Sequence, residues 1–236
     1  MRTVTTGGSV RTRARASEAI AGDLRRMIVT GELAPEAVLS EGDLCELFGC
    51  SRTPLREALQ QLSYNYLVTL PPRRGVHIPP LSILDFQQAH EAMLVIYPAL
   101  ANAANQRITE QQLREMRGLI ADQERANKDG QLYELADLDY RFHTLIARAT
   151  ENQYLLDSVS RLHGAVARWV YRAFEAAGGA TLSIAEHREI LEALHGRDFQ
   201  RVSKTIRDHS ILSSERALNA LGATRGTAIG HRAQQA

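Results

Sequence analysis

The dipeptide Pro79-Pro80 divides the chain into two parts with different residue patterns. After it, apolar residues recur every three or four positions in segment after segment, without the strict alternation that favours strands. Before it, the periodic segments are short and of mixed type. Proline interrupts both helices and strands, so this dipeptide indicates a linker. The second part is therefore predicted to be all helical and the first to be a separate domain.

Six helices are predicted after the linker, and the ends of several are marked. Thr109 with Gln112 and Ser183 with Glu186 have the spacing of capping boxes, and Ser82 with Asp85 is a looser match. Glycines provide stop signals after the second, fourth and fifth helices. The predicted helices cover residues 82–106, 109–129, 131–149, 152–176, 183–195 and 198–221.

The domain boundaries follow from these patterns. We expect a first domain over 17–78, a linker over 79–81 and an all-helical domain over 82–221. Residues 1–16 lack apolar periodicity and predict a flexible arm, while the small and polar residues 222–236 predict a disordered tail.

Composition excludes several classes of protein. A content of 44% hydrophobic and 23% charged residues is typical of a soluble globular chain. The apolar runs are too short to span a membrane, and no apolar export signal follows the first arginines. We therefore expect a cytoplasmic protein with no membrane partner. The only cysteines, Cys45 and Cys50, predict neither a disulfide framework nor a four-ligand zinc site, and we interpret them as packing residues.

The first domain has the pattern of three helices followed by a hairpin. Apolar spacing predicts helices over 17–30 and 40–48, the second capped by Ser40 with Leu44 and Leu47 facing inward, and a third from Ser51. Two short strands, 66–70 and 76–78, are predicted around a turn with a basic tip made of Arg73, Arg74 and Gly75. Three helices and a hairpin in about 60 residues describe a winged helix-turn-helix.

Two arginines occupy the leading end of the third helix. Its inward stripe is Leu55, Ala58, Leu59 and Leu62, and its opposite face carries Arg52, Thr53, Arg56 and Gln60. A recognition helix enters the major groove of DNA in this way, and arginine matches the O6 and N7 acceptors of guanine. The alternative is that these side chains only face solvent. Charge does not decide between the two, because residues 1–80 carry ten arginines against eight acidic residues, and a net charge of +2 is small for a nucleic-acid-binding domain.

The same stretch resembles the DNA-binding domain of GntR-family bacterial transcription regulators. The resemblance rests on Gly-Glu-Leu at 31–33, Leu-Ser-Glu at 39–41, Ser-Arg-Thr-Pro-Leu-Arg-Glu-Ala-Leu at 51–59 and the glycine of the wing. It implies that Arg52 and Arg56 read operator bases, that Thr53 contacts bases or backbone, and that Gly75 lies at a wing tip near the minor groove. Gly42 stands where one branch of the family has a further DNA-contacting arginine, so no contact is expected there.

Polar residues interrupt the apolar stripes of the helical domain. Asp139 and His143 lie four apart on the stripe of helix 131–149, and His187 and His209 lie on the stripes of the last two helices. His187 is nine residues before Gly196 and His209 is 13 after it, so antiparallel helices bring them to a similar level. A buried carboxylate needs a cation, and one aspartate with three histidines suits zinc, with nickel or manganese as alternatives. A single inward histidine is more often a hydrogen-bonded core residue, and it is the combination of the four residues that favours a metal site.

This pattern is similar to the metal-ligand pattern of the all-helical FCD effector domain in the FadR branch of the GntR family. The resemblance implies one divalent metal ion per chain, and a small organic acid as effector whose carboxylate completes the metal shell. Met93 and Tyr97 replace an arginine and a glutamate found in many members, which leaves the class of effector open. His90, near Met93, and His163 are candidates for the effector pocket, with core packing as the alternative.

These observations predict a DNA-binding regulator rather than an enzyme. We expect a homodimer that binds double-stranded operator DNA, acts as a repressor and responds to a small-molecule effector at the metal site. A metal-dependent hydrolase or lyase is one alternative, because an open site of this kind can also activate water. A regulator that senses the metal itself is the other.

Overall fold

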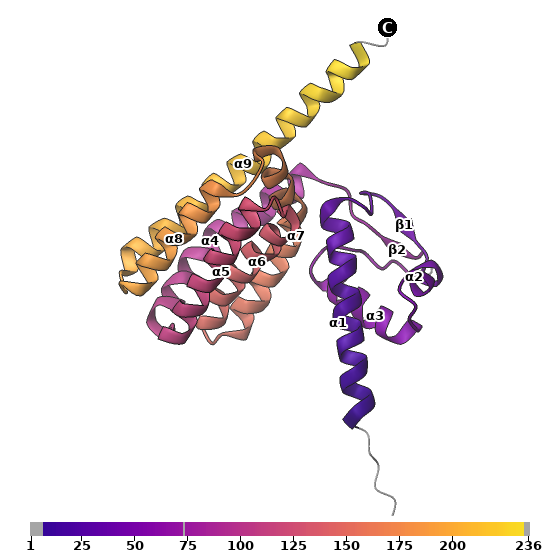
Figure 1. The fold of residues 1–236 in the computed structure, drawn as a ribbon, viewed down its shortest axis with the longest axis horizontal. Coiled ribbons are helices and arrows are strands. Elements are labelled where there is room, and N and C mark those ends of the chain that lie inside the picture. Colours follow the sequence, from indigo (N-terminus) through magenta and orange to yellow (C-terminus); the bar gives the residue numbers. More distant parts are fainter. Residues whose placement is uncertain (1–6, 73, 234–236) are drawn as a thin grey trace, which may run out of the picture. The chain divides into compact units, whose positions relative to one another are not determined.

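The chain folds into two compact units, which are described separately. The computed structural model describes residues 7–72 and 74–233, and side-chain burial within 13–72 and 74–220. The boundary between the units falls between Ser82 and Ile83 (Figure 1). Both units are mainly helical, as the sequence predicts.

The first unit is a small helical domain with a two-stranded sheet. Its core is formed by apolar side chains from all three helices and the wing, among them Leu24, Leu55 and Leu67, each exposed by 1% or less. In chain order the elements are α1 (Gly7–Thr30), β1 (Val38–Leu39), α2 (Glu41–Leu47), α3 (Arg52–Tyr64) and β2 (Val76–His77).

Helix α1 begins earlier than the sequence predicts. Residues 7–16, for which we expected a flexible arm, are helical, and residues 1–6 lie outside the described residues. Alanine and arginine in this segment are strong helix formers. Arg13 also forms a 3.2 Å salt bridge with Glu57 of α3, which links the extended first helix to the third.

The wing differs in part from the predicted hairpin. β1 pairs antiparallel with β2, with Val38 opposite His77, and segment 66–70 contributes only the bridge between Thr69 and His77. The positive φ of Tyr66 (58°) bends the backbone away from an extended conformation. β1 is only two residues long, too short for its pattern to be recognised in the sequence.

The helix caps of this unit are partly as predicted. The Ser40 side chain accepts a 3.0 Å hydrogen bond from the backbone of Asp43 and caps α2. Ser51 occupies the cap position of α3 without a capping hydrogen bond. Leu44 is buried, but Leu47 is 60% exposed, so the prediction that both face inward is wrong for Leu47. Helix α2 has only seven residues, and Leu44 is the one that it buries.

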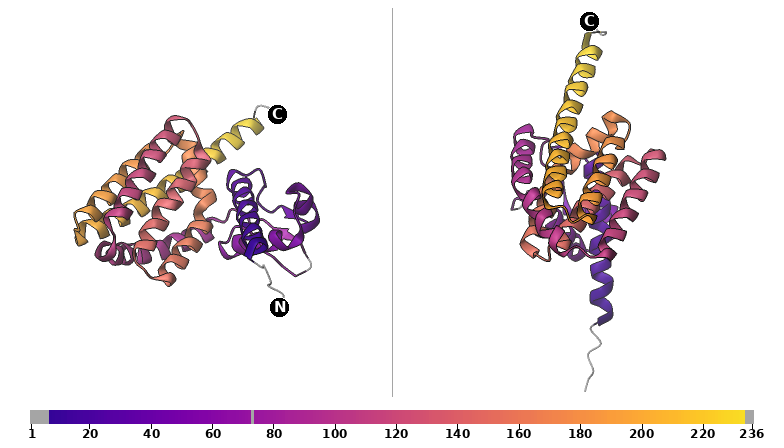
Figure 2. Two further views of the ribbon diagram at one scale, coloured as in Figure 1. Left: turned by 60° about the horizontal axis from the view of Figure 1, so that its bottom comes forward. Right: turned by 90° about the vertical axis from the view of Figure 1, so that its left-hand side faces the viewer.

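The second unit is the predicted bundle of six helices. Figures 1 and 2 show these helices side by side, and α4 packs against α9, α5 against α6, and α6 against α7. The capping box of Thr109 and Gln112 is confirmed at the start of α5. The helices are α4 (Ile83–Arg107), α5 (Glu110–Lys128), α6 (Leu132–Ala149), α7 (Gln153–Ala177), α8 (Thr181–His195) and α9 (Phe199–Ala233).

Two helix ends in this unit differ from the sequence prediction. α8 begins at Thr181, so Ser183 is buried inside the helix and the predicted capping box is wrong. Asn127 of α5 instead accepts a 2.7 Å hydrogen bond from the backbone of Ala180 at this helix start. α9 has no proline to end it and continues through 222–233, where we expected a disordered tail, while residues 234–236 lie outside the described residues. No described helix is long and apolar enough to cross a membrane.

Candidate metal centre and nucleic-acid interface

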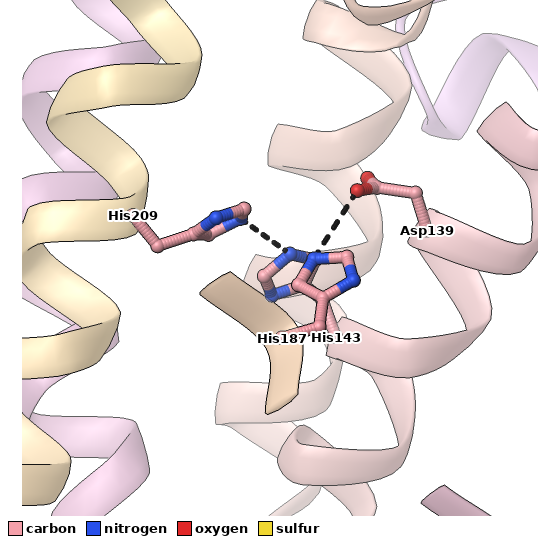
Figure 3. A group of neighbouring side chains, drawn as sticks. All are labelled: Asp139, His143, His187 and His209. Carbon is pink, nitrogen blue, oxygen red and sulfur yellow. Dashed lines mark hydrogen bonds and ion pairs between the residues drawn. The ribbon is translucent and has the colours of Figure 1, made fainter. Parts of the chain in front are cut away.

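Four polar side chains meet in the interior of the helical bundle. Asp139 and His143 come from consecutive turns of α6, His187 from α8 and His209 from α9 (Figure 3). All four are buried, and one ligand atom from each lies within 4.8 Å of the others. We call this group the metal cluster. Its members are the residues that the sequence places on inward helix faces.

The nitrogen and oxygen atoms of the metal cluster face one another closely. Nε2 of His143 lies 3.1 Å from Nε2 of His209. Nε2 of His187 lies 3.5 Å from a carboxylate oxygen of Asp139, as the dashed lines in Figure 3 show. Three imidazoles and one carboxylate are a donor set that suits a divalent metal ion.

Two neighbouring side chains orient two of the three histidine rings, those of His187 and His209. Nδ1 of His187 donates a 3.0 Å hydrogen bond to Gln123 of α5, and Nδ1 of His209 donates a 2.7 Å bond to Glu186 of α8. With Nδ1 protonated, each ring keeps an electron pair on Nε2. Within the described chain, Nε2 of His187 is buried without a hydrogen-bond partner. A cation between the four groups would satisfy it, so the residues present fit a metal ion.

A salt bridge between Glu186 and Arg216 lies next to the metal cluster. Both oxygens of Glu186 accept 2.7 Å hydrogen bonds from Arg216 of α9, which also donates to Ser183. The residues that we interpreted as a capping box, Ser183 and Glu186, are therefore joint partners of Arg216. This contact ties α8 to α9 beside His209.

Burial dominates the electrostatics of the metal cluster. It raises the pKa of the Asp139 carboxyl to about 6, although the electrostatic effects of His209 and Arg216 act in the opposite direction. It also lowers the pKa of His143 and His187 well below the ordinary value. Neutral imidazoles bind metal, and a cation beside Asp139 would favour its ionised form.

A cavity opens beside the metal cluster. Asp139, His143 and His209 line one side of it, so the cluster is accessible from this space. The sequence-based candidates for the effector pocket, His90, Met93, Tyr97 and His163, all line the same cavity. Tyr97 and His163 are hydrogen-bonded to each other, and His90 donates a 2.9 Å bond to the backbone carbonyl of Ser210.

The partners of the ligands were not predicted from the sequence. Gln123 lies on the apolar stripe of α5 with Leu113, Met116 and Ile120, so the signal that identified Asp139 could have identified it. Glu186 and Arg216 lie on partly exposed faces of their helices, where charged residues are common. No periodicity marks them.

The polar face of α3 is exposed as predicted. Leu55, Ala58, Leu59 and Leu62 are buried, whereas Arg52, Thr53, Arg56 and Gln60 are exposed. Nε of Arg56 donates a 2.8 Å hydrogen bond to Glu41, at the start of α2. A groove between this face and the wing is lined by Glu41, Arg56, Gln60, Pro71, Pro72 and Gly75, among others.

The wing tip has a close backbone contact. Gly75 has a φ of +80°, and a Cβ atom there would lie 2.5 Å from the carbonyl oxygen of Leu39. Glycine is the residue that tolerates both conditions. Arg74 is exposed beside it, whereas Arg73 lies outside the described residues.

Comparison with protein families gives two matches. Residues 16–78 match the bacterial regulatory proteins of the gntR family, and residues 88–211 match the FCD domain. The first covers α2, α3 and the wing, and the second covers all four residues of the metal cluster.

Named relatives share most of the chain. The HTH-type transcriptional repressor RspR of Escherichia coli is 30% identical, over 79% of this chain and 82% of that protein. The HTH-type transcriptional repressor GlaR of the same species is 27% identical, over 79% of this chain and 88% of its own length.

Solved structures share the fold. Escherichia coli McbR/YncC superimposes with a TM-score of 0.75 at 21% identity, covering 86% of this chain and 97% of that one. A GntR regulator from Rhodococcus has a TM-score of 0.68 at 22% identity, covering 86% and 98%. The chain therefore belongs to the GntR family of bacterial transcription regulators and carries an FCD domain.

Proposed function

We propose that this regulator is a homodimeric repressor whose affinity for operator DNA is controlled by a small molecule bound at a metal ion. The observation that carries the proposal is the buried metal cluster, in which Asp139 and three histidines converge beside a cavity. Because proteins of this family bind DNA, a ligand bound at this site can act by changing the affinity of the protein for its operator. The names of RspR and GlaR, both repressors, support repression.

One divalent ion per chain would be held by Asp139, His143, His187 and His209. The donor set favours zinc, with nickel or manganese as alternatives. When bound, the ion supplies a positive centre that attracts an anionic group of a ligand. Gln123 and Glu186 keep the rings of His187 and His209 in place, which reduces the cost of ordering the site.

The DNA contacts are proposed to come from α3 and the wing. Arg52, Thr53, Arg56 and Gln60 share the exposed face of α3, which suits insertion into the major groove. Arg74 and Gly75 would approach the backbone and minor groove, and Arg73 is proposed to join them. One helix and one wing read only a few base pairs, so a two-fold dimer on a pseudo-palindromic site is expected.

The proposal is tested with the full-length zinc-loaded protein. Repeated selection from random double-stranded DNA should enrich a pseudo-palindromic sequence, bound at least about 10³-fold more tightly than random DNA. Sedimentation should show a dimer on this sequence. Absence of any enriched sequence, or a monomer on the DNA, would contradict the proposal.

The same preparation distinguishes the two alternatives. Titration of free zinc against operator binding would identify a metal sensor if zinc alone switches the affinity. Screening against small lactones and esters of carboxylic acids would identify an enzyme if turnover depends on zinc and is lost in Asp139→Ala. A regulator controlled by a separate ligand shows neither result.

A further inference from the structure

The wall of the cavity beside the metal cluster carries very little charge. The cavity lies between α4, α6, α7 and α9, and no lysine or arginine is present among the described residues that line it. Among the described residues of the lining, Asp139 is the only acidic one, and it belongs to the metal cluster itself. A negative charge on a bound molecule therefore has no lysine or arginine of the described lining to pair with, and the metal ion is the group that can compensate it.

Several polar groups of the wall already form hydrogen bonds within the protein. His90 donates to the carbonyl of Ser210, whose own hydroxyl donates a 2.9 Å bond to the carbonyl of Ile206. Tyr97 and His163 are hydrogen-bonded to each other. Much of the remaining wall is apolar and consists of Phe86, Met93, Val166, Val170 and Ala217.

The net charge of the metal-loaded cluster determines which ligand charge the cavity favours. A divalent ion and the Asp139 carboxylate together leave one positive charge, because the histidine ligands are neutral. Glu186, which contacts His209, is balanced by its double hydrogen bond with Arg216. One carboxylate on the ligand therefore completes neutrality, and a second would be buried in the cavity without a lysine or arginine among the described lining residues to pair with.

We infer that the ligand of this cavity is a small monocarboxylate with an uncharged, largely apolar body. The inference rests on the proposed function, because it places the carboxylate at the metal ion. The cavity volume of about 40 Å³ corresponds to roughly three water-sized spaces, so the body has only a few non-hydrogen atoms. Dicarboxylates and phosphate esters are disfavoured, since their second charge finds no cation in the wall.

Calorimetric titration of the zinc-loaded full-length protein tests this inference with pairs of equal chain length. Butyrate is compared with succinate, and propionate with malonate. We expect at least one monocarboxylate to bind at least 10-fold more tightly than its dicarboxylate partner. Equal or tighter binding of the dicarboxylates would overturn the inference.

A positive charge added to the cavity wall should reduce the preference for monocarboxylates over dicarboxylates. Met93→Arg places a cation in the cavity and should increase the affinity for succinate relative to butyrate. Val95→Arg, on the exposed side of the same helix, is the matched control and should leave the ratio unchanged. Ser213→Arg, at a half-buried position of the lining, gives a second test if Met93→Arg is poorly folded. An unchanged ratio in a folded cavity variant would contradict the inference.

Metal content separates failure of the inference from failure of the proposed function. Native mass spectrometry is carried out on the same sample. A protein that holds zinc but binds neither class of acid overturns the monocarboxylate inference and leaves the metal centre intact. A folded protein that holds no zinc overturns the proposed function, and with it the inference.

Discussion

The carboxylate of Glu41 accepts a 2.8 Å hydrogen bond from Nε of Arg56, across the junction between α2 and α3. This bond uses only one of the three guanidinium nitrogens. A bidentate contact with guanine can use the two terminal nitrogens. Glu41 therefore restrains the guanidinium that is proposed to read a base, without competing for that edge.

Replacement of Glu41 should reduce specificity while increasing general affinity for DNA. In Glu41→Gln we expect the ratio of specific to random binding to fall roughly three- to tenfold, because Arg56 loses its restraint. Binding to random DNA should strengthen, because one negative charge is removed near the phosphates. Fluorescence anisotropy on both DNAs measures this, with Arg56→Ala expected to cost about 1–3 kcal/mol on the specific site.

The control for this prediction removes the same charge from another place. Glu57 lies on α3 but pairs with Arg13. Glu57→Gln should increase binding to both DNAs without a selective loss on the specific site. If it reduces the ratio as much as Glu41→Gln does, the contact between Glu41 and Arg56 is not the cause.

Arg74 should contribute affinity without sequence preference. It is exposed at the wing tip, where we propose a phosphate contact. Arg74→Ala should weaken binding to specific and random DNA alike and reduce the slope of log K against log salt by about 1. Binding is measured at several salt concentrations, with the exposed Arg125 of the second unit as the site of a control substitution. A loss confined to the specific site would assign Arg74 to base reading instead.

Gly75→Ala should destabilise the first unit. An alanine at this position has an unfavourable positive φ, and its Cβ would lie 2.5 Å from the carbonyl oxygen of Leu39. We expect a loss of about 1–3 kcal/mol in the free energy of unfolding, measured by denaturant titration. Gly42→Ala is the control, because the nearest atom to its added Cβ is 3.5 Å away, and it should stabilise α2 by about 0.5–1 kcal/mol. Equal effects of the two substitutions would contradict this account of the wing.

The residues that could be predicted from the sequence are those whose position relative to the apolar stripe of their own helix can be read from the spacing. Asp139 and His143 interrupt an apolar stripe, and the exposed arginines of α3 lie opposite one, so helical periodicity alone identifies both sets. Glu186 contacts His209 of a neighbouring helix from a partly exposed position, and its spacing from Ser183 predicted a helix cap instead. Strand β1 was missed because it is only two residues long. The outer ends of α1 and α9 were missed because their residues lack the apolar periodicity by which the helices were predicted.

Gln123 should increase the affinity of the metal cluster without touching the ion. It accepts the hydrogen bond from Nδ1 of His187, and its side chain is buried. Gln123→Leu keeps a similar volume but removes the acceptor, so the ring loses its orientation and part of its basicity. We expect zinc affinity to fall about 10–100-fold, measured by competition with a chelator. Gln111→Leu, on the exposed side of the same helix, should have no effect, and an equal loss there would point to a general change in α5.

Metal binding by the second unit and DNA binding by the first should be separable by mutation. The metal cluster joins α6, α8 and α9, so an ion and its ligand can change the packing of three helices from a single point. This affects DNA binding only if the ligand binds more tightly to one arrangement of the dimer than to another. The first unit has its own core, in which Leu24, Leu55 and Leu67 are almost fully buried.

We therefore expect His187→Ala and His209→Ala to lose the metal and the response to ligand together, while binding to the operator persists at least in part. Metal content is measured by mass spectrometry, and operator affinity with and without butyrate and propionate. His195→Ala, at the exposed end of α8, is the control and should keep both properties. A cluster variant that keeps stoichiometric metal, or that loses metal and still responds to the ligand, would exclude this mechanism, because the ion would then not be the point through which the ligand acts.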